Sequence, residues 1–141
     1  MRTFPNIIGT AAIALMATTS AQAHDPVAKS ETVSPVFNKE LPNIPGKRIV
    51  AAVVSYEPGA KSPSHTHANS AFIYAFVLSG EIRSQVGDEA AKVYKTGESF
   101  FENPGSHHRI SENASNEQPA SLLAVFVLDV DDNQLTTPDK K

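Results

Sequence analysis

The chain has 141 residues, a formal net charge of −3 and no cysteine. This length fits a single domain. The lack of thiols excludes thiol catalysis and thiolate metal sites, so any metal must be held by nitrogen and oxygen. Basic residues form no patch, since Lys47 and Arg48 are the only adjacent basic pair before the terminal Lys140 and Lys141. We therefore expect no nucleic-acid partner.

The first 23 residues have the pattern of a secretory signal. A short positive end at Met1 and Arg2 precedes an apolar run from 7 to 17, and a small-residue cleavage site ends at Ala23. The run has 11 residues, whereas a helix needs about 20 to cross a bilayer. We therefore expect a signal peptide over 1–23 and a periplasmic or secreted mature protein, with no membrane span after the signal is removed.

The remaining chain has an all-β pattern. Residues 24–45 contain prolines and polar residues, and we expect a flexible N-terminal arm and lead-in there. Runs rich in β-branched and aromatic residues, bounded by Gly or Pro, predict strands at 49–56, 71–78, 81–86, 91–95, 99–102, 107–111 and 121–127. A charged tail, 131–141, is expected to fray. Periodicity alone fits a jelly roll over 46–130 and, nearly as well, an immunoglobulin-like sandwich.

Histidines at the mouths of two of these strands form a candidate metal site. His65 and His67 are alternate residues, so on an extended chain both imidazoles share one face. His107 and His108 are adjacent and face opposite sides, so at most one of them joins the pair. Two histidines from one strand and one from another make a minimal open metal site. The alternative is that His65 and His67 are an isolated H-x-H pair on the protein surface that binds no metal.

The spacing around these histidines resembles the two signatures of the cupin superfamily. Gly59, His65, His67 and Gly80 are similar to the first, G-x5-H-x-H-x(3,4)-E-x6-G. The segment from Gly97 to 113 is similar to the second, G-x5-P-x-G-x2-H-x3-N. This alignment picks His108 as the third ligand. The resemblance, to small exported single-domain cupins, implies a jelly-roll β-barrel and a homodimer.

The departures from the signatures change the expected chemistry. The glutamate of the first signature falls at Ala71, Phe72 or Ile73, none of which binds a metal. In the second signature Asn103 replaces the proline and Glu112 the asparagine. The resemblance thus implies a three-histidine site that leaves a divalent metal with its full charge and attracts anionic ligands. Three nitrogen donors do not distinguish Fe, Zn, Ni, Cu or Mn.

Other residues are candidates for supporting roles. Ser70, Tyr74 and Gln85 could line the cavity and orient a substrate. Glu102 could act as a distant ligand or base, although a solvated strand end is the alternative that we favour. His107 could be a hydrogen-bond partner behind the ligands, or a replacement ligand if the turn register shifts; we expect the former or an exposed side chain. No residue can be assigned a catalytic role.

Three functions fit this sequence. The first is a metal-dependent enzyme of the dioxygenase type, acting on a small anionic or enolisable molecule, as in the three-histidine cupins that cleave acetylacetone or oxidise thiols. The second is a non-catalytic module that binds a small ligand or a metal. The third is a metal-free structural barrel. The question of enzyme or binding module therefore stays open at this point.

Overall fold

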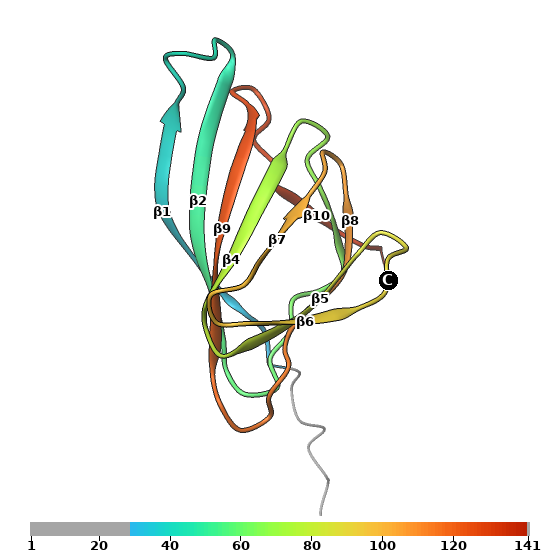
Figure 1. The fold of residues 1–141 in the computed structure, drawn as a ribbon. Coiled ribbons are helices and arrows are strands. Elements are labelled where there is room, and N and C mark those ends of the chain that lie inside the picture. The colour runs from blue at the N-terminus through green and yellow to red at the C-terminus, as the bar shows by residue number, and fades with distance from the viewer. Residues whose placement is uncertain (1–28, 141) are drawn as a thin grey trace, which may run out of the picture.

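A computed structural model describes residues 29–140, so the expected signal peptide, 1–23, lies outside the described residues. Within that range the chain forms ten strands in two antiparallel sheets that face each other (Figure 1). The first sheet has the order β1 (Thr32–Glu40), β2 (Lys47–Tyr56), β9 (Ala120–Asp129), β4 (Phe72–Ser79) and β7 (Ser99–Glu102). The second has the order β10 (Thr136–Pro138), β3 (His65–His67), β8 (His107–Asn113), β5 (Glu81–Val86) and β6 (Lys92–Lys95).

This arrangement is the expected jelly-roll sandwich, and its core follows from the period of two along each strand. β9 lies at the centre of the first sheet, and its residues alternate between buried and half-buried. The buried set includes Leu122, Ala124 and Phe126, which pack with Ile73 and Ala75 of β4. The inner face of the first sheet is therefore an apolar wall opposite the second sheet.

A glycine allows the chain to pass from the first sheet to the second. Gly80 joins β4 to β5 with a φ of 69°, a conformation that residues with a side chain rarely adopt. A Cβ at this position would lie 2.6 Å from the carbonyl oxygen of Pro119. Both the backbone conformation and the close approach of the neighbouring chain therefore require glycine here.

Two segments that the sequence predicts to be irregular are strands in the structure. β1 lies in the expected flexible arm and pairs with β2 from Thr32 to Glu40, with a register shift next to Pro35 that accommodates the proline. β10 lies in the expected frayed tail and pairs with β3. All residues of both strands are exposed, so neither carries the apolar alternation by which a strand is recognised.

β3 is also a short strand that the apolar pattern does not predict. It lies between β10 and β8, and it carries two of the candidate metal ligands. In the described part of the chain, no helix is long and apolar enough to cross a membrane.

Candidate metal centre

The three predicted histidine ligands meet on the inner face of the second sheet. β3 pairs with β8 so that His65 lies opposite His108, and His67 follows two residues along the same face. One ring nitrogen from each histidine lies within 4.8 Å of the others. The ring centroids are 4.7 Å apart for His65 and His67, and 5.3 Å apart for His65 and His108. The structure thus brings together nitrogen donors that could bind one metal ion.

Each ring is held in place through the nitrogen that points away from the others. His65 Nδ1 donates to the carbonyl oxygen of Pro63 at 2.7 Å, and His67 Nδ1 donates to that of Leu135 at 3.3 Å. His108 Nε2 lies 2.9 Å from the hydroxyl of Ser84. Hydrogen bonds of this kind fix the orientation and tautomer of metal-binding histidines. They leave His65 Nε2, His67 Nε2 and His108 Nδ1 free to face one another.

A carboxylate joins the three histidines, which corrects the expectation that Glu102 is a solvated strand end. Glu102 is only 2% exposed. Its Oε2 lies 3.1 Å from His67 Nε2, and its Oε1 lies 3.2 Å from His108 Nδ1. The alternation along β7 explains this position, because Phe100 points into the core and Glu102 follows it by two residues. Phe100 and Phe101 are both apolar, so the sequence does not decide which of them points inward; the structure places Phe100 inward at 8% exposure and Phe101 outward at 59%.

The register of the first sheet relates this carboxylate to the glutamate that the cupin signature lacks. Glu102 of β7 lies directly opposite Ile73 of β4, and Ile73 is one of the three positions where the signature places its glutamate. The candidate site therefore has a carboxylate beside its three histidines, supplied by a neighbouring strand. An ionised glutamate lowers the net charge of a bound metal. The expectation that a bound metal keeps its full charge is therefore also corrected.

The charge states at the site favour metal binding. Burial alone would raise the pKa of the Glu102 carboxyl, but the adjacent His108 and His67 outweigh it and hold the pKa at about 2. Burial, as the largest effect, lowers the pKa of His65. Metal ligands must be ionised carboxylates and neutral imidazoles. Glu102 and His65 are in those states at neutral pH.

One contact in the site is satisfied only when a proton or a metal ion lies between its two atoms. His67 Nδ1 donates to Leu135, so in the neutral ring Nε2 carries a lone pair. It faces Glu102 Oε2 at 3.1 Å, and both atoms are buried without a hydrogen-bond partner. Two buried acceptors in contact are unfavourable unless a positive charge lies beside both. A protonated His67 would satisfy this contact as a buried ion pair, and a divalent metal would satisfy it as a shared ligand centre. With a nitrogen of His65 and of His108 within 4.8 Å, the donor set fits a divalent metal.

A cavity of about 240 Å³ opens onto these ligands. Its walls are mostly apolar, with side chains that include Phe100, Leu122 and Phe126. Its polar lining beyond the ligands includes the hydroxyl of Tyr56, which lies 2.8 Å from those of both Ser62 and Ser111. Glu31 and Glu102 line the cavity too, whereas none of its lining residues in the described chain is Lys or Arg.

The other predicted supporting residues lie outside this cavity. Ser70 donates to the carboxylate of Asp132 at 2.8 Å. Tyr74 points to the outer face of the first sheet, because Ile73 and Ala75 take the inner positions of β4. The side chain of Gln85 donates to the carbonyl oxygen of Glu89. None of the three is a lining residue of the cavity, so the structure does not support their predicted role.

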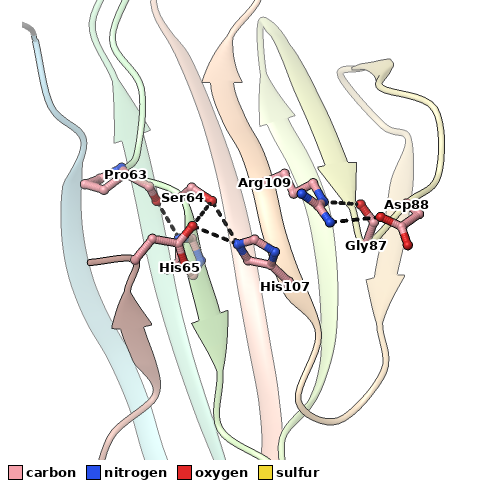
Figure 2. A network of polar contacts seen from close by, with 8 residues as sticks. Pro63, Ser64, His65, Gly87, Asp88, His107 and Arg109 are labelled. Atoms are coloured by element: carbon pink, nitrogen blue, oxygen red, sulfur yellow. Dashed lines mark hydrogen bonds and ion pairs between the residues drawn. The ribbon is translucent and has the colours of Figure 1, made fainter. Parts of the chain in front are cut away.

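His107 lies on the other face of β8 from His108 and is half-buried. Figure 2 shows its ring pointing toward Ser64, whose hydroxyl is 3.0 Å from His107 Nε2. His107 Nε2 also lies 2.9 Å from Asp139 Oδ2. His107 therefore contacts the residue that precedes His65 and does not reach the three ligands itself.

Comparison with known proteins identifies the class. A family described as "Cupin domain" matches residues 52–126, more than half of the chain. The chain therefore belongs to the cupin family, as its signatures and its fold both indicate.

Solved structures agree with the fold. Protein TT1209 of Thermus thermophilus is 28% identical, with a TM-score of 0.57 over 70% of this chain and 84% of that one. A double-stranded β-helix protein of Klebsiella pneumoniae is 23% identical, with a TM-score of 0.61 over 83% of this chain and 90% of that one. A cupin of Methanocaldococcus jannaschii is 16% identical, with a TM-score of 0.57 over 76% and 88%. No functionally curated protein matches the chain.

Proposed function

We propose that the protein is a metal-binding cupin in which His65, His67, His108 and Glu102 hold one divalent transition metal. The observation that carries this proposal is the convergence of one nitrogen from each histidine within 4.8 Å, with the buried Glu102 carboxylate 3.1 Å from His67 Nε2. A metal bound there would supply Lewis acidity toward an oxygen donor of the substrate. Three nitrogens and one carboxylate suit Fe, Zn, Ni, Cu or Mn.

We further propose that the cavity takes a small, enolisable and uncharged molecule, such as a diketone. The expectation of an anionic ligand rested on a site without a carboxylate, and Glu102 removes that argument. Glu102 lowers the charge of a bound divalent metal from +2 to +1, Glu31 on the cavity wall opposes an anion, and the described lining offers no cationic side chain to attract one. Apolar walls favour a largely apolar body. The Tyr56 hydroxyl would hold one oxygen of the molecule.

Metal analysis of the purified protein tests the metal site. We expect one divalent metal per chain in the wild type and a complete loss in His65→Ala and His108→Ala. Asp88→Asn serves as the control, because Asp88 pairs with Arg109 at 2.8 Å on the exposed side of the same sheet (Figure 2). Metal that stays at trace levels in all four proteins would instead support the metal-free structural barrel.

Oxygen consumption with a panel of diketones and thiols then separates an enzyme of the dioxygenase type from a binding module. A specific observation favours the binding module as the second candidate. Glu102 is the carboxylate at the histidines, and a pKa of about 2 makes it a weak general base. Tight binding of a panel member without turnover would establish this alternative.

We also propose export to the periplasm or beyond the cell, on the basis of the signal pattern in residues 1–23. Cell fractionation together with N-terminal sequencing tests this proposal. The expected mature protein begins at His24. A purified protein that still carries the first 23 residues and stays with the cytoplasmic fraction would overturn it.

A further inference from the structure

The chain segment 135–139, which we call the strap, forms one wall of the candidate metal centre. Its residues Leu135, Thr136 and Pro138 line the cavity. Its central part is β10, which pairs with β3 so that Thr136 lies opposite His67 and Pro138 lies opposite His65. β3 has only three residues and lies between β10 and β8. The strap therefore supports one side of the strand that carries two ligands.

The strap also contacts a ligand ring directly. The carbonyl oxygen of Leu135 accepts hydrogen bonds from His67 Nδ1 at 3.3 Å and from the backbone N–H of Ala68 at 3.2 Å. The first of these bonds fixes the tautomer in which His67 Nε2 faces Glu102. A rotation or loss of the strap would release that tautomer.

The far end of the strap is fastened beside the other two ligands. Asp139 Oδ2 accepts from the Ser64 hydroxyl at 2.7 Å and lies 2.9 Å from His107 Nε2. The backbone N–H of Asp139 also donates to the Ser64 carbonyl at 3.0 Å. Ser64 precedes His65 and His107 precedes His108 in the chain, and Figure 2 shows both side chains turned toward the same point.

We propose that the strap holds the metal ligands in their binding geometry, with Asp139 as a positioning residue that fastens it. This inference rests on the proposed metal centre. The strap is exposed along β10 and has no buried apolar side chain in that strand. Leu135 at its start packs against the core, whereas Asp139 at its end makes polar contacts. Breaking the Asp139 contacts therefore loosens the site without removing part of the core. We expect the strap to control how fast the centre releases its metal.

The test uses full-length protein loaded with Co²⁺ and compares wild type, Asp139→Ala, Asp139→Glu and Asp88→Asn. We expect Asp139→Ala to lose Co²⁺ to a chelator about tenfold faster, within the range found for hydrogen-bond partners of metal ligands. Its visible absorption bands should shift, and its unfolding midpoint without metal should stay unchanged. Asp139→Glu should restore the wild-type rate and spectrum. Asp88→Asn is the matched control, because it breaks an exposed ion pair beside His108.

A second readout does not need a metal. In the metal-free wild type, ¹⁵N spectra of the histidine rings should show a proton on His67 Nδ1, held by the Leu135 carbonyl, and Asp139→Ala should show a smaller population with that proton. If Asp139→Ala matches Asp88→Asn in the release rate, the Co²⁺ bands and the ring spectra, the strap proposal is overturned. If the wild type takes up no Co²⁺, the proposed metal centre fails, and the ring spectra alone decide the role of the strap.

Discussion

Glu102 lies directly opposite Ile73 in the pair formed by β7 and β4. Directly opposite residues of an antiparallel pair point to the same side, with Cβ atoms about 5 Å apart. A carboxylate at either position therefore reaches the same region of the cavity. The cupin signature places its glutamate on the strand that follows the two histidines, and this chain supplies one from the neighbouring strand.

This relationship predicts the effect of moving the carboxylate. Glu102→Gln should weaken binding of a divalent metal by about tenfold or more, because the charged donor is lost. Ile73→Glu in the Glu102→Gln background should recover part of the affinity, because it restores a carboxylate on the same face. Competition against a coloured chelator measures both changes.

Glu112→Gln is the matched control for this series, since Glu112 lies on β8 but pairs with Arg83 away from the site. It should bind metal like the wild type. Equal affinity in Glu102→Gln and Glu112→Gln would show that the buried carboxylate is not a ligand.

The sequence predicts the histidines of the site because their spacing is local information. Two alternate residues share a face in any strand, so His65 and His67 converge whatever the fold. Glu102 follows an inward Phe100 by the same rule, yet its charge favoured an exposed position. Ser111 could not be placed in this way, because a register shift opposite Gln85 and Val86 turns both His108 and Ser111 inward.

The strap shows the other limit of prediction from sequence. β10 forms because its backbone pairs with β3, a strand far away in the chain, and its side chains are exposed. Such pairing leaves no periodic pattern in the sequence. The same holds for β1, whose nine residues are exposed. The barrel core is therefore predictable from alternation, whereas the edge strands that complete the sheets are not.

Tyr56 should make the free energy of unfolding depend on pH in the alkaline range. Burial, as the largest effect, raises the pKa of the Tyr56 hydroxyl in the folded protein, while an unfolded tyrosine ionises at about 10. Above that pH the unfolded chain loses the proton first, so the free energy of unfolding falls as the pH rises toward the folded pKa. Urea denaturation at a series of pH values measures this slope.

Tyr56→Phe should show a shallower decline at alkaline pH, and near pH 7 it should be less stable by about 1–3 kcal/mol, because Ser62 and Ser111 each lose a hydrogen-bond partner. Tyr74→Phe, at a tyrosine on the outer face, is the control and should keep the wild-type slope. Identical slopes in wild type and Tyr56→Phe would contradict the assignment.

Gly80 should be among the least replaceable residues of the fold. An alanine there would adopt a left-handed conformation, which costs about 1–2 kcal/mol, and its Cβ would meet the Pro119 carbonyl oxygen at 2.6 Å. We expect Gly80→Ala to destabilise the protein by about 2–5 kcal/mol, adding the cost of overpacking. Chemical denaturation of the metal-free protein provides the measurement.

Gly87→Ala separates the two costs. Gly87 has a φ of 58°, but a Cβ there would meet nothing within 4 Å. Gly87→Ala should therefore lower the free energy of unfolding only by the cost of the left-handed backbone conformation, about 1–2 kcal/mol. If both variants lose the same amount, the close approach of Pro119 contributes nothing to the requirement for glycine.

We propose that two copies of the chain meet at the outer face of the first sheet. Phe72 of β4 and Phe101 of β7 stack there with ring centroids 5.8 Å apart, although they are 41% and 59% exposed. β4 and the part of β9 that pairs with it, residues 121–127, contain no charged residue. Two copies can therefore face each other there without like-charge repulsion. An exposed apolar patch of this kind is typical of an interface between subunits.

We expect light scattering of the mature wild-type protein to give the mass of a dimer. Phe101→Asp places a charge within the patch and should give a monomer, because a buried charge without a partner opposes association. Ile44→Asp is the matched control, since Ile44 is similarly exposed, at 46%, but lies in the turn between β1 and β2. A dimer that persists in Phe101→Asp, or a wild type that is monomeric, would place the contact between copies elsewhere or remove it.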